Sequence, residues 1–113
     1  MTATAPGFER VERVAPAQVA EGTLVPAKIA NGAALCIGRF GGALFATKDS
    51  CPHSEFPLSE GTLYADGTLE CAWHGARFDC RTGAVLRGPA EDPLVRFDVE
   101  EREGGIWVRR APR

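Results

Sequence analysis

The sequence predicts a small all-β protein whose antiparallel strands form a sandwich or a barrel. Its apolar residues fall into short runs that are separated by glycine-containing turns. No window of about 11 residues sustains a helical period, and several turns contain dipeptides that favour tight hairpins. A chain of 113 residues suits one domain around one core. We therefore expect a single β-sheet unit.

The N-terminal half has the pattern of a meander of three or four strands. Pro6 and Gly7 mark residues 1–7 as a flexible tail, so the domain is expected to span residues 8–110. Asn31-Gly32 and Gly41-Gly42 are expected hairpin turns, because a type I′ turn needs positive φ at both central positions. The expected strands are residues 8–14, 23–30, 33–40 and 43–47, and residues 15–19 are expected to form a turn or one helical turn.

The second half of the chain contains three further hairpin signals. Asp66-Gly67 separates two short apolar runs, and Arg81-Thr82-Gly83 separates two more. The last two expected strands are residues 94–99 and 105–109, with a charged turn over residues 100–104 between them. Residues 48–93 are otherwise poor in strand-like runs, so we expect a loop-rich excursion there.

Composition and charge exclude several classes of protein. Thirteen Lys and Arg are scattered among 15 Asp and Glu, for a formal net charge of −2, so no basic face for nucleic acid is expected. The longest apolar runs fall far short of the roughly 20 residues that cross a bilayer. Residues 1–10 have no apolar signal segment. We expect a cytoplasmic protein, by default a monomer, whose thiols stay reduced.

Two short motifs contain both histidines of the chain. Cys51-Pro52-His53 is followed, 17 residues later, by Cys71-Ala72-Trp73-His74. Thiolates and imidazoles are the ligands of zinc and of some iron–sulfur clusters. The one-residue spacer of the first motif is unusual for structural zinc, whose paired ligands are typically two to four residues apart. The residues alone leave open both an iron–sulfur centre and a zinc site that staples an interaction domain.

The two motifs resemble the signature of Rieske-type [2Fe–2S] proteins. Further matching segments are Ser59-Glu60-Gly61, His74-Gly75-Ala76-Arg77-Phe78-Asp79, Arg81-Thr82-Gly83, and Gly88-Pro89-Ala90 with Pro93-Leu94. The last segment resembles the family's proline loop, which covers the cluster. In length the chain is similar to the ferredoxin components of bacterial aromatic-ring-hydroxylating dioxygenase systems. The resemblance implies a small antiparallel β-sandwich with a cluster-binding loop subdomain at about residues 48–93.

The resemblance also implies a cofactor and its ligands. One [2Fe–2S] cluster would be bound by Cys51 and Cys71 on one iron and by His53 and His74 on the other. Two neutral imidazoles in place of two thiolates make such a cluster less negative, which raises its potential to roughly −150 to +300 mV.

The residues around these ligands predict where in that range the potential lies. High-potential members of the family have further cysteines in the two ligand loops and hydroxyl donors after the second histidine. This chain has Phe56, Trp73, Ala76 and Phe78 at the corresponding positions. Because hydrogen bonds to the sulfurs stabilise the reduced cluster, their loss lowers the potential. We expect the low end, near about −150 mV.

The expected function is one-electron transfer rather than catalysis. The resemblance implies a flavin-dependent reductase that uses NADH or NADPH as donor and a terminal oxygenase as acceptor, each docking transiently at the histidine end of the cluster. An oxygenase of the family would need two further histidines for a mononuclear iron, and the chain has only two. A G-x-G-x-x-G dinucleotide motif is also absent. The alternatives are a small Rieske-like subunit fixed in a larger reductase complex and the zinc-stapled domain.

Three groups of residues near the motifs have less specific expectations. Cys36 and Cys80 are expected to be small buried apolar residues. The apolar residues beside the ligands either shield the cluster or dock partners; they are Phe56, Pro57, Leu58 and Trp73. Five acidic residues are expected to be solvated turn residues that together steer a basic partner; they are Asp49, Glu55, Glu60, Glu91 and Asp92.

Overall fold

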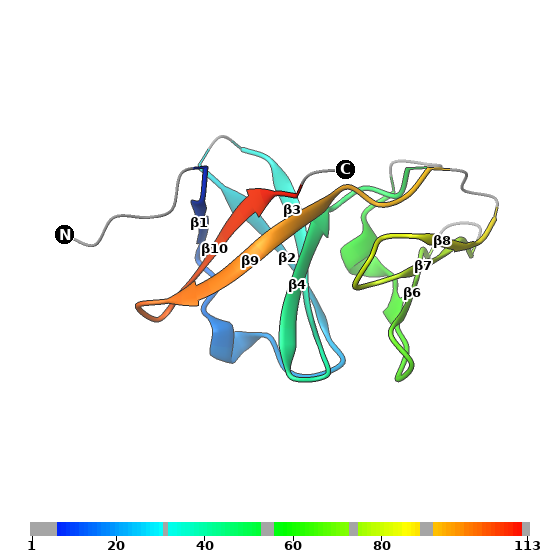
Figure 1. Ribbon diagram of the computed structural model, residues 1–113, viewed down its shortest axis with the longest axis horizontal. Coiled ribbons are helices and arrows are strands. Elements are labelled where there is room, and N and C mark those ends of the chain that lie inside the picture. Colours follow the sequence, from blue (N-terminus) through cyan, green and yellow to red (C-terminus); the bar gives the residue numbers. More distant parts are fainter. Residues whose placement is uncertain (1–6, 31, 53–55, 73–74, 89–91, 112–113) are drawn as a thin grey trace.

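The computed structural model describes residues 7–30, 32–52, 56–72, 75–88 and 92–111. These residues form two antiparallel β-structures that lie next to each other (Figure 1). One is a closed six-stranded barrel, and the other is a four-stranded sheet. The prediction of an antiparallel all-β fold is confirmed. Of the two expected architectures, the main strands adopt the barrel.

The barrel strands come from both ends of the chain. Their order around the barrel is β1-β10-β9-β4-β3-β2. β1 closes the barrel because it pairs with two strands. Glu9 lies opposite Val108 of β10, and Val11 lies opposite Ile29 of β2. The bounds are β1 Glu9–Glu12, β2 Leu24–Ile29, β3 Ala34–Phe40, β4 Ala43–Lys48, β9 Arg96–Arg102 and β10 Gly105–Arg110.

Two turns show how local sequence determines the barrel connections. At Gly41-Gly42 both φ angles are positive, +64° and +82°, as the predicted hairpin requires. Glu21 stabilises this turn because its carboxylate accepts hydrogen bonds from both glycine N–H groups, each at 2.8 Å. The type I′ prediction at Asn31-Gly32 is not tested, because residue 31 lies outside the described residues.

Two strand predictions differ from the structure. The first strand is shorter than residues 8–14, because Arg13 has a φ of +62° and cannot continue a strand. The last hairpin is longer than expected: Glu100 to Arg102 remain in β9, and the turn is confined to Glu103-Gly104. The charged residues fit a strand there because Arg102 and Glu100 form an ion pair on the same face.

Residues 48–93 are more regular than the expected loop excursion. They contain the second sheet, whose strand order is β5-β6-β7-β8. Both predicted hairpins, at Asp66-Gly67 and at Arg81-Thr82-Gly83, are confirmed. The bounds are β5 Thr62–Leu63, β6 Thr68–Glu70, β7 Arg77–Asp79 and β8 Val85–Arg87. A 3-10 helix, η2 Leu58–Glu60, precedes β5, and a second one, η1 Pro16–Gln18, lies between β1 and β2 of the barrel.

Strand β3 is buried on both faces and separates two apolar cores. Leu35 and Ile37 point into the barrel core with Ile106. Cys36, between them, belongs to a second core that contains the buried side chains of the four-stranded sheet. Because alternate residues of a strand face opposite sides, a strand that lies between two apolar cores needs a continuous apolar run.

Phe40 at the end of β3 links the barrel to the second sheet. Its ring lies 3.0 Å from where a Cβ atom of Gly67 would be, in the β5–β6 turn. The guanidinium of Arg81 stacks on the ring with its carbon 4.6 Å from the ring centre. The turns of both hairpins of the second sheet thus pack against the barrel.

No helix within the described ranges is long and apolar enough to cross a membrane.

Arg39 is expected to be one of the main stabilising residues of the barrel. Its guanidinium donates hydrogen bonds to the carbonyl oxygens of Val19 at 2.8 Å, Gly42 at 2.9 Å and Pro16 at 3.0 Å. We expect Arg39→Ala to lower the free energy of unfolding by about 2–4 kcal/mol, because three carbonyls lose a charged donor. Urea unfolding followed by circular dichroism measures this. Lys28→Ala, at an exposed strand position, is the control and should change it by less than about 0.5 kcal/mol; equal losses in the two variants would contradict the assignment.

Candidate metal centre

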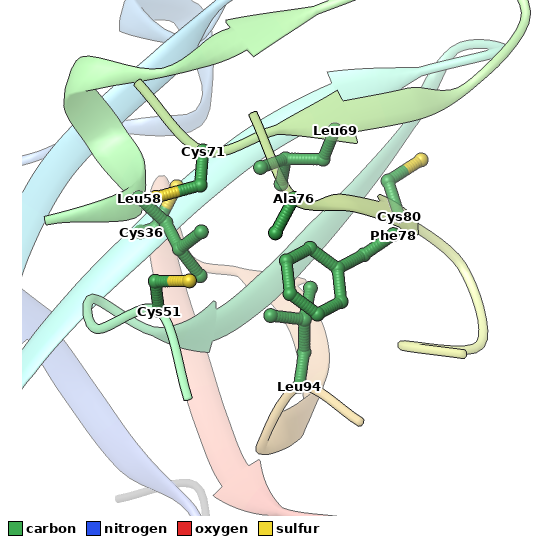
Figure 2. Packing of buried hydrophobic residues seen from close by; sticks show 9 residues of the cluster. All are labelled: Cys36, Cys51, Leu58, Leu69, Cys71, Ala76, Phe78, Cys80 and Leu94. Carbon is green, nitrogen blue, oxygen red and sulfur yellow. The ribbon is translucent and has the colours of Figure 1, made fainter. Parts of the chain in front are cut away.

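Cys51 and Cys71 begin the two predicted ligand loops and are both buried. Cys51 follows β4, and Cys71 comes directly after β6. Their exposed fractions are 0% and 1%, and both belong to one apolar cluster with Leu58 and Phe78. Figure 2 shows the two cysteine side chains on either side of Leu58. Residues 20 positions apart in sequence are thus placed in the same core.

The two loops are closed by the same backbone contact. The N–H of Cys51 donates to the carbonyl oxygen of Phe56 at 2.9 Å, and the N–H of Cys71 donates to that of Ala76 at 2.8 Å. In each loop the bond joins the cysteine to the residue five positions later. The backbone around both cysteines is therefore similarly constrained, as expected for two equivalent halves of one site.

The donor chemistry of the two cysteines fits a metal or an iron–sulfur cluster. No disulfide joins any of the four cysteines, all of which lie in the described ranges. Thiol groups in an apolar setting can serve as thiolate ligands once a metal replaces the proton. His53 and His74 lie outside the described residues, so the four-ligand set stays a prediction.

Cys36 and Cys80 are buried as expected, with exposed fractions of 0% and 1%. Burial raises the pKa of the Cys36 thiol, and the nearby Asp49 carboxylate raises it further. Burial also raises the pKa of the Cys80 thiol to about 11. Both side chains are therefore neutral thiols near pH 7, which suits apolar packing.

The apolar residues near the cysteines act as a wall rather than as an exposed patch, as far as the structure describes them. Leu58 is fully buried, and Phe56 is half-buried against the same cluster. Ala76 and Phe78, at the positions where high-potential relatives are expected to have hydroxyl groups, are both fully buried there. Trp73 lies outside the described residues.

Asp49 has a structural role that the sequence analysis missed. Its carboxylate accepts hydrogen bonds from the N–H and the hydroxyl of Ser59, both at 2.7 Å. Ser59 lies in η2, so this contact ties the chain before Cys51 to the helix that follows the loop. Asp49 is therefore not the solvated acidic residue that its position in sequence indicated.

A second polar network, also missed, supports the loop of Cys71. Glu70 and Arg77 lie opposite each other in β6 and β7, and Arg77 Nε donates to Glu70 Oε2 at 3.0 Å. The Tyr64 hydroxyl donates to Glu70 Oε1 at 2.6 Å. These hydrogen bonds lower the pKa of Glu70 and raise that of Tyr64. Side-chain contacts between residues 6 and 7 positions apart leave no signal in the sequence pattern.

Comparison with known proteins identifies the family. The chain matches the Rieske [2Fe-2S] domain family over residues 9–98. It is 42% identical over 90 residues to the ferredoxin component of the p-cumate 2,3-dioxygenase system of Pseudomonas putida, covering 80% of this chain and 76% of that relative. It is 39% identical over 87 residues to ferredoxin CarAc of Metapseudomonas resinovorans, covering 77% and 80% of the two chains.

The solved structures agree with the sequence comparison. A chain from the complex of reduced oxygenase and oxidized ferredoxin in carbazole 1,9a-dioxygenase superposes with a TM-score of 0.83 and 32% identity. The match covers 96% of this chain and 100% of that one. With two buried cysteines on equivalent loops and a family match over most of its length, this chain belongs to the Rieske [2Fe–2S] family, whose cofactor is one Rieske-type [2Fe–2S] cluster.

Proposed function

We propose that the protein carries single electrons from an NAD(P)H-dependent flavoprotein reductase to a terminal oxygenase of the aromatic-ring type. The observation that supports this most is that two buried cysteines sit on matched loops in a chain similar over most of its length to ferredoxin components. The protein is a carrier, not an enzyme, and it acts as a cytoplasmic monomer.

The proposed ligands are Cys51 and Cys71 for one iron and His53 and His74 for the other. When bound, the cluster takes up and releases one electron. The chain's own part is to hold the two cysteines in fixed loops and to keep water from the sulfurs with buried side chains such as Leu58 and Phe78. Small, short-lived contacts with each partner are what a shuttle requires.

The charges of the chain favour partners with a basic surface. Residues 48–93 contain eight acidic and four basic residues, whereas the rest of the chain contains seven acidic and nine basic residues. Glu60, Asp66 and Asp92 in this stretch are exposed. We call residues 48–93 the acidic end, and an acidic surface of this kind accelerates encounter with a basic partner.

The metal content tests the proposal first. We expect about two irons and two acid-labile sulfides per chain, and a rhombic EPR signal only after dithionite reduction. Cys51→Ala, His53→Ala, Cys71→Ala and His74→Ala should each lose the signal, because each removes one proposed ligand. Cys36→Ala and Cys80→Ala are the controls and should retain it, since those thiols pack as apolar groups.

Three results would contradict the ligand assignment. One is zinc without sulfide in protein made with ample iron, which would indicate a structural metal site. The others are a native signal in any of the four ligand variants and its loss in the two control variants.

The reduction potential tests the role of the residues around the sulfurs. We expect a potential near about −150 mV, and we expect Ala76→Ser to raise it by about 40–90 mV. The added hydroxyl would give a sulfur one hydrogen bond worth roughly 1–2 kcal/mol more in the reduced state. Voltammetry measures both values. Ala84→Ser, at an exposed turn position, is the control; an unchanged or lower potential in Ala76→Ser would refute the argument.

Electron transfer to an oxygenase tests the proposed partner. In stopped-flow mixing with an oxidised aromatic-ring oxygenase, the reduced protein should be reoxidised more slowly as ionic strength rises. The double variant Glu60→Gln/Asp92→Asn should slow the second-order step by about threefold or more, because it removes two exposed charges from the acidic end. Glu103→Gln, an exposed residue of the barrel, should leave it unchanged. A rate independent of salt, or a rate equal in the unmodified protein and both variants, would exclude electrostatic steering at this end.

A further inference from the structure

The two ligand loops are supported by different side-chain contacts that come close to each other at one residue. The first loop is held by the hydrogen bonds that Ser59, in η2, donates to the carboxylate of Asp49. The second loop is held by the Glu70–Arg77 pair immediately before Cys71 and after Ala76. Gly61, directly after η2, lies between these two supports.

Gly61 packs directly against the backbone of Glu70. A Cβ atom at Gly61 would overlap the carbonyl oxygen of Glu70 and would lie 3.2 Å from the carbonyl carbon of the same residue. It would also lie 3.1 Å from the carbonyl oxygen of Leu58. The atoms in its way are all backbone atoms, which cannot rotate aside as the end of a side chain does. The chain directly after η2 is therefore packed against the backbone of Glu70, with no room for one further carbon.

Space, not backbone conformation, explains glycine at this position. Gly61 has φ −84° and ψ −158°, an extended conformation that other residues adopt without strain. Its N–H donates to the carbonyl oxygen of Leu58 at 2.9 Å, so it is also fixed to η2. Any side chain would have to push Glu70 and η2 apart.

That displacement would act on the ligand loops themselves. The carbonyl of Glu70 belongs to the same peptide group as the N–H of Cys71, which closes the second loop on Ala76. On the other side, Leu58 in η2 belongs to the same buried apolar cluster as Cys51 and Cys71. A shift at Gly61 therefore moves one cysteine relative to the other.

We propose that Gly61 is a positioning residue that sets the separation of the two ligand loops, through close contact of η2 with the Glu70–Cys71 peptide. This rests on the proposed function in one respect, namely that Cys51 and Cys71 are ligands of the same cluster. The residue touches neither the cluster nor a partner; it acts by fixing how closely the two cysteine-bearing segments approach.

The test compares Gly61→Ala with Gly105→Ala in the purified, cluster-loaded protein. Gly105 lies in β10, and the three atoms nearest to a Cβ there all belong to the end of the Arg10 side chain, the first being Nε at 2.9 Å. Gly105→Ala thus adds the same methyl group at a buried strand position of the barrel, but against the flexible end of the Arg10 side chain, which can move. Both variants are measured by iron release to bathophenanthroline, by the g-values of the reduced protein and by the reduction potential.

We expect Gly61→Ala to release iron at least about tenfold faster than the unmodified protein, which corresponds to overpacking of one methyl group against backbone. Its g-values and potential should also shift, whereas Gly105→Ala should keep all three properties. The g-values distinguish positioning from general stability, because simple destabilisation speeds release without changing the electronic structure of intact clusters. Native release, g-values and potential in Gly61→Ala would overturn the proposal.

Two milder variants apply if Gly61→Ala does not fold. Ser59→Ala removes one of the two hydrogen bonds to Asp49, and Tyr64→Phe removes one of those to Glu70. Each should speed iron release at least about twofold and shift the potential, because each loosens one support. Native values in both variants would overturn the proposal.

The failure of this inference is distinguishable from the failure of the proposed function. The metal and sulfide content of the unmodified protein decides whether the cluster is present. The ratio of metal-release rates between Gly61→Ala and Gly105→Ala decides the role of Gly61, and it has the same meaning whichever metal the two cysteines bind.

Discussion

The packing of the four-stranded sheet against the outer face of β3 is the interaction on which the rest of this protein depends. Cys36, between two residues of the barrel core, lies in the same apolar cluster as Cys51 and Cys71. Neither the two-residue β5 nor the three-residue strands beside it would be stable alone. The closed barrel supplies the surface that this small sheet needs, so the positions of Cys51 and Cys71 depend on strands outside the two cysteine loops.

A ligand site on loops needs constraints that loops do not provide by themselves. Here each cysteine is fixed by a backbone hydrogen bond across its own loop, and each loop is fixed at its base by a carboxylate, Asp49 or Glu70. Such hydrogen bonds restrict the movement of Cys51 and Cys71. A one-electron carrier benefits, because little atomic rearrangement is then needed when an electron arrives or leaves.

Burial and charge divide the molecule into parts with separate tasks. The thiols lie in an apolar core from which water is excluded, and the acidic residues of the same stretch are on its surface, for example Glu60 and Asp92. The structure reassigned one acidic residue: Asp49, which its position in sequence grouped with the surface charges, is committed to Ser59. A hydrogen-bond partner ten residues away decides whether a carboxylate belongs to the surface or to the support of the site.

The sequence by itself determined the features that depend on near neighbours. Gly41-Gly42 and Asp66-Gly67 placed two of the hairpins, because positive φ is a local requirement. The spacing of the Cys and His residues indicated the family, because ligand chemistry is encoded in residue type. Only the tertiary structure decided that the main strands close as a barrel, that the two hairpins of residues 48–93 join into one four-stranded sheet, and that Glu100 to Arg102 continue β9. It also explains the glycine at position 61. The backbone there is extended, but the carbonyl oxygen of Glu70, nine residues away, occupies the space that a Cβ atom would need. Contacts between distant segments depend on the whole packing arrangement, and no periodicity or local propensity records them.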